Sequence, residues 1–216
     1  MPPFALSLLL LVAAYLLGSL SGSVLLGRRR GADIRTLGSG SAGATNAFRT
    51  QGARFGVAVA LFDIAKGALA AWCALRLIPY QPGYPGPAAH AYAGAFAAAI
   101  GHVWPLWHGF RGGKGAATLA GGVLVLWPWV APWLVLAWMA TIVSSGYVGA
   151  ATVVAGLCLA AAALLSGAEL PRLAYCLGSA ALLLLTHRDN LSRLLRGGES
   201  RFERARLLHR LWRRDG

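Results

Sequence analysis

The stretch His108-Gly109-Phe110-Arg111-Gly112-Gly113-Lys114-Gly115 separates two apolar runs that are long enough to enter a membrane. It places three glycines in four residues, with two cations among them. Because glycine takes left-handed dihedrals freely, such a stretch can turn several backbone N–H groups toward one anion. If a helix begins at Ala116, its unpaired N–H groups and positive dipole end add to the attraction. The sequence therefore predicts a phosphate site at the edge of a bilayer.

A nucleotide P-loop, G-x-x-x-x-G-K-[ST], is excluded at two positions. His108 stands where that motif needs its first glycine, and Gly115 stands where it needs a hydroxyl for magnesium. A phosphate ester is therefore favoured over ATP as the ligand. A basic re-entrant turn that only anchors the chain at lipid headgroups is the alternative interpretation.

The composition predicts an all-α polytopic membrane protein. The chain has 216 residues, of which 57% are hydrophobic and 12% charged, with a mean hydropathy of +0.58. Its net charge of +13 falls in three stretches, 28–54, 111–114 and 188–214, which is typical of cytoplasmic loops. We therefore expect membrane lipid around the chain and no nucleic-acid partner. The cysteines lie inside apolar segments without C-x-x-C spacing, so no metal site is expected.

The apolar runs predict about seven transmembrane helices. Stretch 116–143 is too long for one span, and Pro128 divides it. The split leaves an even number of crossings between the two basic stretches 28–54 and 188–214, as it must if both are cytoplasmic. Cations follow the first run instead of preceding it, which predicts a retained span with the N-terminus outside and the C-terminus inside. The expected spans are 4–26, 55–78, 88–107, 116–127, 128–143, 147–165 and 170–186.

Residues 1–216 are expected to form a single membrane-embedded domain. Its tail, 201–216, is basic and is either an amphipathic membrane-surface segment or disordered. Within the second span, Asp63 and Lys66 share one helical face. Charges inside a span are costly, so a structural ion pair is favoured and a proton or ion path is the alternative.

Three polar stretches are predicted on one face of the membrane. They read GSGSAGATNAFR at 38–49, GHVWPLWHGFRGGKG at 101–115, and HRDNLSRLLRGGE at 187–199. In order, these stretches resemble the GSGNxGATNxLR, GHxxPxxxxFKGGKG and HRxNIxRLxxGxE motifs of bacterial acyl-phosphate:glycerol-3-phosphate acyltransferases, the integral-membrane PlsY type. The resemblance covers about residues 18–201. It departs from the pattern at Ser41, Arg111 and Ser21, where the family commonly has Asn, Lys and Pro.

The resemblance implies transfer of a fatty acyl group from acyl phosphate to the 1-hydroxyl of sn-glycerol 3-phosphate. The products are lysophosphatidic acid and phosphate, in phospholipid biosynthesis. It further implies no cofactor, a location in the bacterial cytoplasmic (inner) membrane with the site facing the cytoplasm, and a partnership with an enzyme that produces acyl phosphate. A transporter of a phosphorylated metabolite is the alternative, although polar groups near mid-membrane and an internal repeat would be expected of it.

The residue roles also follow from the resemblance. The catalytic candidates are Ser39, Lys114, His187 and Asn190. The substrate-binding candidates are Arg49, Thr45, Asn46, Arg111, Gly112, Gly113, Gly115, His102 and Glu199. A hydrogen bond at a helix end is as good an explanation of His102, and Glu199 can be structural. The general base is either a side chain or a phosphate oxygen of the substrate, and an acyl-serine at Ser39 is less favoured.

Overall fold

The computed structural model describes residues 3–28, 31 and 33–202, and these residues form helices and connecting loops without a β-strand. The predicted basic tail lies outside the described residues beyond Phe202. The α-helices are α1 Pro3–Ser19, α2 Gly22–Arg28, α3 Ala44–Gln51, α4 Ala53–Leu77, α5 Pro87–Val103, α6 Ala116–Leu126, α7 Ala131–Ser145, α8 Val148–Leu165, α9 Leu170–Thr186 and α10 Arg188–Leu195. Short 3-10 helices occur at Ile34–Thr36, Leu106–His108 and Pro128–Val130.

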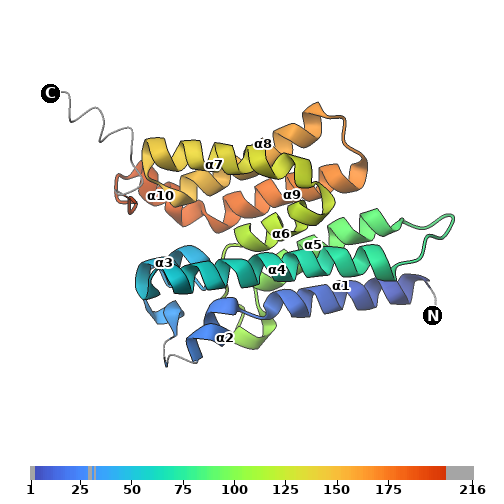
Figure 1. The fold of residues 1–216 in the computed structure, drawn as a ribbon, viewed down its shortest axis with the longest axis horizontal. Helices are drawn as coiled ribbons and strands as arrows, with labels where there is room; N and C mark the ends of the chain where they lie inside the picture. The colour runs from blue at the N-terminus through green and yellow to red at the C-terminus, as the bar shows by residue number, and fades with distance from the viewer. Residues whose placement is uncertain (1–2, 29–30, 32, 203–216) are drawn as a thin grey trace.

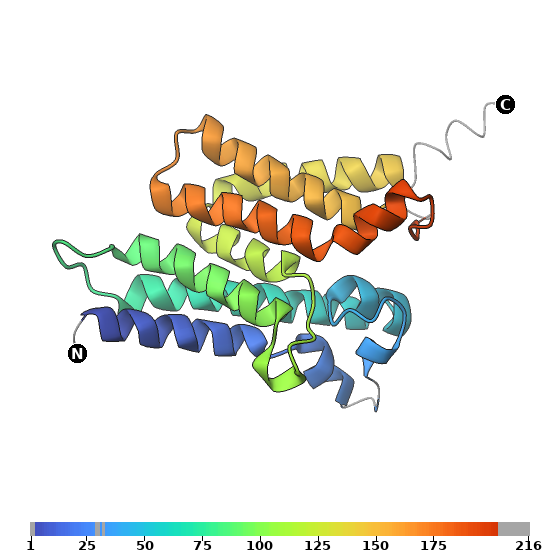
Figure 2. The same ribbon diagram turned by 180° about the vertical axis from the view of Figure 1, so that it is seen from behind.

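The long helices form two layers with α6 between them (Figure 1). One layer contains α1, α4 and α5, and the other contains α7, α8 and α9, as the reverse view also shows (Figure 2). Helix α6 packs mainly on α4 and α5, and α9 also reaches α5. Two crossings are very close: a Cβ on Gly67 would lie 2.0 Å from the Thr118 carbonyl oxygen, and one on Gly18 would lie 2.0 Å from that of Ala98. Only glycine allows such close backbone contact, which packs α1 tightly on α5 and α4 tightly on α6.

The first apolar run is not one continuous helix, contrary to the prediction for 4–26. Helices α1 and α2 meet at an angle of 47°. The Lys66 ammonium of α4 donates hydrogen bonds to the carbonyl oxygens of Gly18 and Leu20, at 2.9 Å each. These carbonyls lie where the helix breaks and would otherwise lack helical partners. A buried cation from a neighbouring helix therefore stabilises the bend.

Lys66 also forms the ion pair that the sequence predicts. Its Nζ lies 2.9 Å from Asp63 Oδ1, and both side chains are buried. The ring nitrogen Nδ1 of His102, on α5, lies 2.8 Å from the same Nζ. One cluster therefore joins α1, α4 and α5, which is the arrangement expected of a structural pair.

The predicted division of the long apolar stretch is confirmed. Helix α6 ends at Leu126, a 3-10 turn begins at Pro128, and α7 begins at Ala131. Among the described residues, three helical segments are long and apolar enough to cross a membrane: Ala53–Leu77, Pro128–Ser145 and Val148–Leu165. The bent pairs α1–α2 and α9–α10 raise this number to five, and α6 is a shorter apolar helix. The count of seven crossings stays a prediction.

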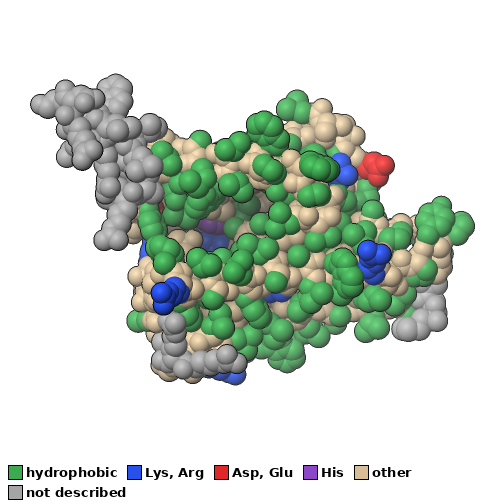
Figure 3. All heavy atoms as spheres, in the orientation of Figure 1, with side chains coloured by type: hydrophobic (Ala, Val, Ile, Leu, Met, Phe, Trp, Pro, Cys, Tyr) green, Lys and Arg blue, Asp and Glu red, His purple; other side chains and the backbone are tan. Residues whose placement is uncertain are grey.

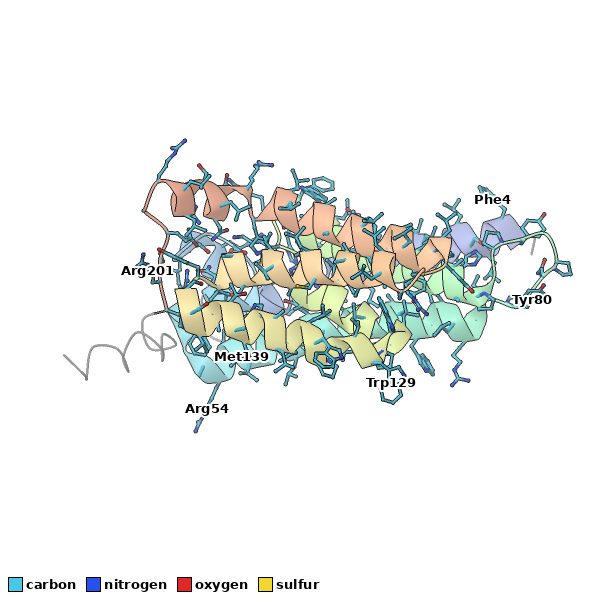
Figure 4. All side chains as sticks on the ribbon, turned by 90° about the horizontal axis from the view of Figure 1, so that it is seen from above. Phe4, Arg54, Tyr80, Trp129, Met139 and Arg201 are labelled. Carbon is cyan, nitrogen blue, oxygen red and sulfur yellow. The ribbon has the colours of Figure 1, made fainter. Side chains whose placement is uncertain are left out.

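The three polar stretches lie at one end of the bundle. Arg54 and Arg201 mark this end, and Phe4 and Tyr80 mark the other (Figure 4). Helices α3 and α10 lie at the first end, and the loop before α6 lies in the same half of the bundle (Figure 1). The sequence therefore predicts correctly which segments meet.

Candidate functional site

A polar pocket of about 130 Å³ lies where α3, α6, α8 and α10 converge. Ten of the thirteen predicted site residues line it: Ser39, Thr45, Asn46, Arg49, His102, Lys114, Gly115, His187, Asn190 and Glu199. A second pocket of about 250 Å³ lies beside it, and both share Ser39, Ser41 and Lys114. Figure 3 shows a hollow in the lateral surface with histidine and Lys or Arg colours at its base.

The glycine-rich loop is built differently from the prediction. Gly112 and Gly113 do not have left-handed dihedrals; among the loop residues, Gly109, Phe110 and Gly115 do. Gly112 and Gly113 instead permit close approach to His102, because added Cβ atoms would lie 2.0 Å from its carbonyl oxygen and 2.1 Å from its Nε2, respectively. Both glycines line the second pocket.

Helix α6 begins where the sequence predicts. Gly115 is its N-cap, in the left-handed conformation, and Ala116 is its first residue. Gly115, Ala116 and Ala117 all line the polar pocket. The unpaired N–H groups of the first helical turn therefore lie at the pocket wall, where they favour an anion.

Arg111 is the one predicted residue that lines neither polar pocket. It is exposed, and its backbone N–H donates to the His108 carbonyl. The structure therefore does not bring Arg111 to the cations of the pocket.

Lys114 is held by a chain of polar side chains. Its ammonium donates to Asn190 Oδ1, and Asn190 Nδ2 donates to Glu199 Oε1 at 2.6 Å. The other Glu199 oxygen accepts from Arg193 Nε at 2.7 Å. Burial lowers the pKa of Lys114, and the nearby Arg193 charge adds to this effect. Both carboxylate oxygens of Glu199 accept hydrogen bonds from protein groups, so Glu199 holds Asn190 in place.

His187 lies at the junction of α9 and α10 with its ring largely buried. Its Nδ1 lies 2.9 Å from the Leu183 carbonyl oxygen, which can only accept, so Nδ1 carries the proton. Burial, followed by the Lys114 charge, lowers the pKa of His187 to about 4. The ring is therefore neutral near pH 7 and leaves Nε2 as a hydrogen-bond acceptor.

Asn46 organises the first polar loop from inside. Its Nδ2 donates to the carbonyl oxygens of Ile34, Leu37 and Ser41, and its Oδ1 accepts from the Ser39 N–H at 3.0 Å. The buried amide is thus occupied by the loop backbone. It fixes Ser39, whose side chain is exposed and borders both polar pockets.

An apolar cavity of about 360 Å³ adjoins the polar pocket between α6 and the α7–α8 pair. Ala116, Ala117 and Thr152 line both spaces, so the two cavities are neighbours that share these residues as a wall. Sequence reasoning missed Thr152. A single threonine in an apolar run does not indicate a functional site, because its hydroxyl can simply donate to a carbonyl of the preceding helical turn. The Thr152 hydroxyl does so to the Val148 carbonyl oxygen.

The fold and the site define a helical membrane protein with a cationic pocket at one end of its bundle and an apolar cavity beside it. The family model described as glycerol-3-phosphate acyltransferase matches residues 8–197. The chain therefore belongs to the glycerol-3-phosphate acyltransferase family.

Individual relatives agree with this family. A glycerol-3-phosphate acyltransferase of Anaeromyxobacter dehalogenans (strain 2CP-C) is 41% identical over 93% of this chain and 100% of its own length. One from Aquifex aeolicus (strain VF5) is 34% identical, over 91% and 99% of the two chains. A crystal structure of PlsY (YgiH), an integral membrane glycerol 3-phosphate acyltransferase in its glycerol 3-phosphate form, superposes with a TM-score of 0.83. It is 33% identical and matches over 91% of this chain and 95% of the other.

Proposed function

We propose that this protein transfers a fatty acyl group from acyl phosphate to the 1-hydroxyl of glycerol 3-phosphate, which yields lysophosphatidic acid and phosphate. The observation that carries the proposal is that a cationic pocket lies directly beside an apolar cavity, with Ala116, Ala117 and Thr152 lining both. A substrate with an anionic head and a fatty tail fits that pair of spaces. Family membership supports glycerol 3-phosphate as the acceptor.

The cationic groups are assigned to phosphate. Lys114, Arg49 and the first N–H groups of α6 bind phosphate oxygens and stabilise the charge that develops on the departing phosphate. Ser39 and His187 contact the glycerol phosphate, with neutral His187 Nε2 accepting from its hydroxyl. Asn190 holds the Lys114 ammonium in position, as their hydrogen bond supports.

The reaction proceeds by direct transfer in this proposal. The 1-hydroxyl oxygen attacks the acyl carbonyl carbon, the bond from that carbon to the phosphate oxygen breaks, and the proton passes to a phosphate oxygen. His187 is a weak base at its lowered pKa. No hydrogen bond joins Ser39 to His187 within the part of the chain that the structure describes, which supports direct transfer over an acyl-serine.

The location proposed is the bacterial cytoplasmic membrane, with seven crossings and the site facing the cytoplasm. The proposal is supported by cations at the site end: Arg28 is the last residue of α2, Arg188 and Arg196 flank α10, and Arg54 is labelled there in Figure 4. Arg76 lies in the last turn of α4 and Arg172 in the first turn of α9, and these helix ends lie at the other end of the bundle (Figure 1). The C-terminus is then cytoplasmic and the N-terminus outside. An enzyme that produces acyl phosphate is the functional partner in this proposal, and no cofactor is required.

The test is acyl transfer to labelled glycerol 3-phosphate by the purified protein in detergent. Acyl phosphate, acyl-CoA and acyl carrier protein are offered separately, and we expect lysophosphatidic acid from acyl phosphate alone. A Lys114→Met variant retains the stem length and loses the charge, so its rate should fall sharply. Product from acyl-CoA alone would refute the assignment of acyl phosphate as the donor. If folded protein gives no product with any donor, the proposed acyltransferase activity is wrong.

A further inference from the structure

The chain after α10 turns back and runs beside the polar pocket, which Glu199 lines. Leu195 ends α10, and the chain reverses at Gly197, which has a positive φ of 74°. The Gly198 N–H then donates to the Arg193 carbonyl at 2.8 Å. We call residues 199–202 the strap. Its first residue, Glu199, points inward to Asn190 and lines the pocket.

The strap joins the two layers of the bundle. On one side the Phe202 N–H donates to the Gly146 carbonyl at 2.8 Å, and the Arg201 guanidinium lies 5.0 Å from the Tyr147 ring centroid. These two contacts hold the turn between α7 and α8. On the other side the Phe202 ring packs on Phe48 of α3, with centroids 5.7 Å apart. Since residues of α3 and α8 line the polar pocket, the strap connects two elements that flank it.

The strap also holds Arg49, which lines the pocket from α3. The Arg49 guanidinium carbon lies 5.1 Å from the Phe202 ring centroid, and its NH2 group donates to the Ser200 carbonyl at 3.5 Å. An exposed arginine otherwise samples many rotamers, which it must give up on binding a ligand. An aromatic face restricts that sampling before the ligand arrives.

We propose that Phe202 is a positioning residue for Arg49 and so sets the affinity for a phosphate-bearing substrate. The proposal rests on the proposed function, in which Arg49 binds phosphate. Phe202 does not touch the reacting atoms, and its loss leaves the Arg49 charge and Lys114 in place, so substrate binding should weaken more than the chemical step slows. The aromatic face is required, because an aliphatic side chain of similar size fills space without attracting a guanidinium.

The experiment compares Phe202→Ala, Phe202→Leu and Phe202→Tyr by steady-state kinetics, varying each substrate in turn. Phe202→Ala and Phe202→Leu should both raise the KM for glycerol 3-phosphate or acyl phosphate by about threefold to tenfold, with kcat within about twofold of wild type. Phe202→Tyr keeps an aromatic face and should therefore retain the wild-type KM values. Phe4→Ala, at the opposite end of the bundle and 73% exposed, is the matched control.

Each other outcome overturns the inference. If Phe202→Leu behaves as wild type, the residue only fills space; if kcat falls while both KM values hold, it does not act through binding. Unchanged kinetics in Phe202→Ala refute it outright. If Phe202→Ala fails to fold, the comparison of leucine with tyrosine still decides. Failure of the proposed function is separate, because it would appear as an inactive wild type.

Discussion

Narrowing the apolar cavity at Ala120 should shorten the acyl chain that the protein accepts. Ala120 lines the cavity on α6, one helical turn beyond Ala116, which borders the polar pocket as well. At 1.5 Å per residue it lies about 6 Å deeper along the helix. A phenylalanine there would occupy the space taken by the methylenes of a long chain beyond that depth.

The magnitude follows from the number of methylenes displaced. Burying one methylene from water is worth about 0.8 kcal/mol, so displacing about four costs about 3 kcal/mol, or roughly 200-fold in kcat/KM. Chain that escapes into the micelle keeps its apolar surroundings, which reduces the loss toward about tenfold. An eight-carbon acyl phosphate has fewer methylenes beyond that depth and should lose much less.

The assay is acyl transfer by Ala120→Phe with acyl phosphates of eight, twelve and sixteen carbons. Ala161→Phe is the matched control, because Ala161 is exposed on α8 and lines neither the polar pockets nor this cavity. If the eight-carbon and sixteen-carbon donors lose the same factor, or if the two variants behave alike, the assignment of this cavity to the acyl chain is wrong.

Three further predictions concern the bundle and the loop. Lys66→Met should destabilise the protein by about 3–5 kcal/mol, because it leaves a buried carboxylate and two helix-end carbonyls unpaired; unfolding in detergent measures this, and a loss below about 1 kcal/mol contradicts it. The His187 ring should stay neutral from pH 8 to about 5, as nitrogen NMR can check. Between about pH 6.5 and 4 the unfolded chain takes up a proton at this histidine and the native protein does not, so the free energy of unfolding should fall as the pH is lowered. Protonation of His187 near pH 6.5 in the native protein would refute both the neutral ring and this loss of stability. Gly113→Ala should lower kcat/KM at least about tenfold, because its Cβ would lie 2.1 Å from His102 Nε2, whereas Gly86→Ala, with no atom within 4 Å of its Cβ, should match wild type.

The sequence predicts the position of the site better than its internal connections. Charge clustering and apolar run lengths were enough to bring the three polar stretches to one end, and the pair of Asp63 and Lys66 was visible from helical spacing. The partner His102 was not, because it comes from a different helix. The link from Asn190 to Glu199 depends on a chain reversal at Gly197, which local patterns do not specify.

The errors have physical reasons. A run of apolar residues does not reveal a break when the compensating group is a lysine 46 residues away, as at Leu20. The sequence does not distinguish a glycine needed for close packing from one needed for a left-handed dihedral. Gly112 and Gly113 were therefore predicted to have left-handed dihedrals, whereas they serve close packing on His102. Arg111 was predicted because it lies in the glycine-rich stretch and at the lysine position of the family motif, but the residue is exposed and lines neither polar pocket.

The unequal walls of the apolar cavity bear on which lipids the protein can discriminate. On one side, α6 lies on α4 with backbone against the glycine at 67, so that wall cannot yield without breaking the crossing. On the other side stands α7, which packs mainly on α8, touches α6 at few points and is largely exposed. An overlong tail can therefore push α7 outward more easily than α6. We therefore expect the cavity to set only a loose upper limit on the size of the acyl tail, because α7 can move while α6 stays fixed on α4.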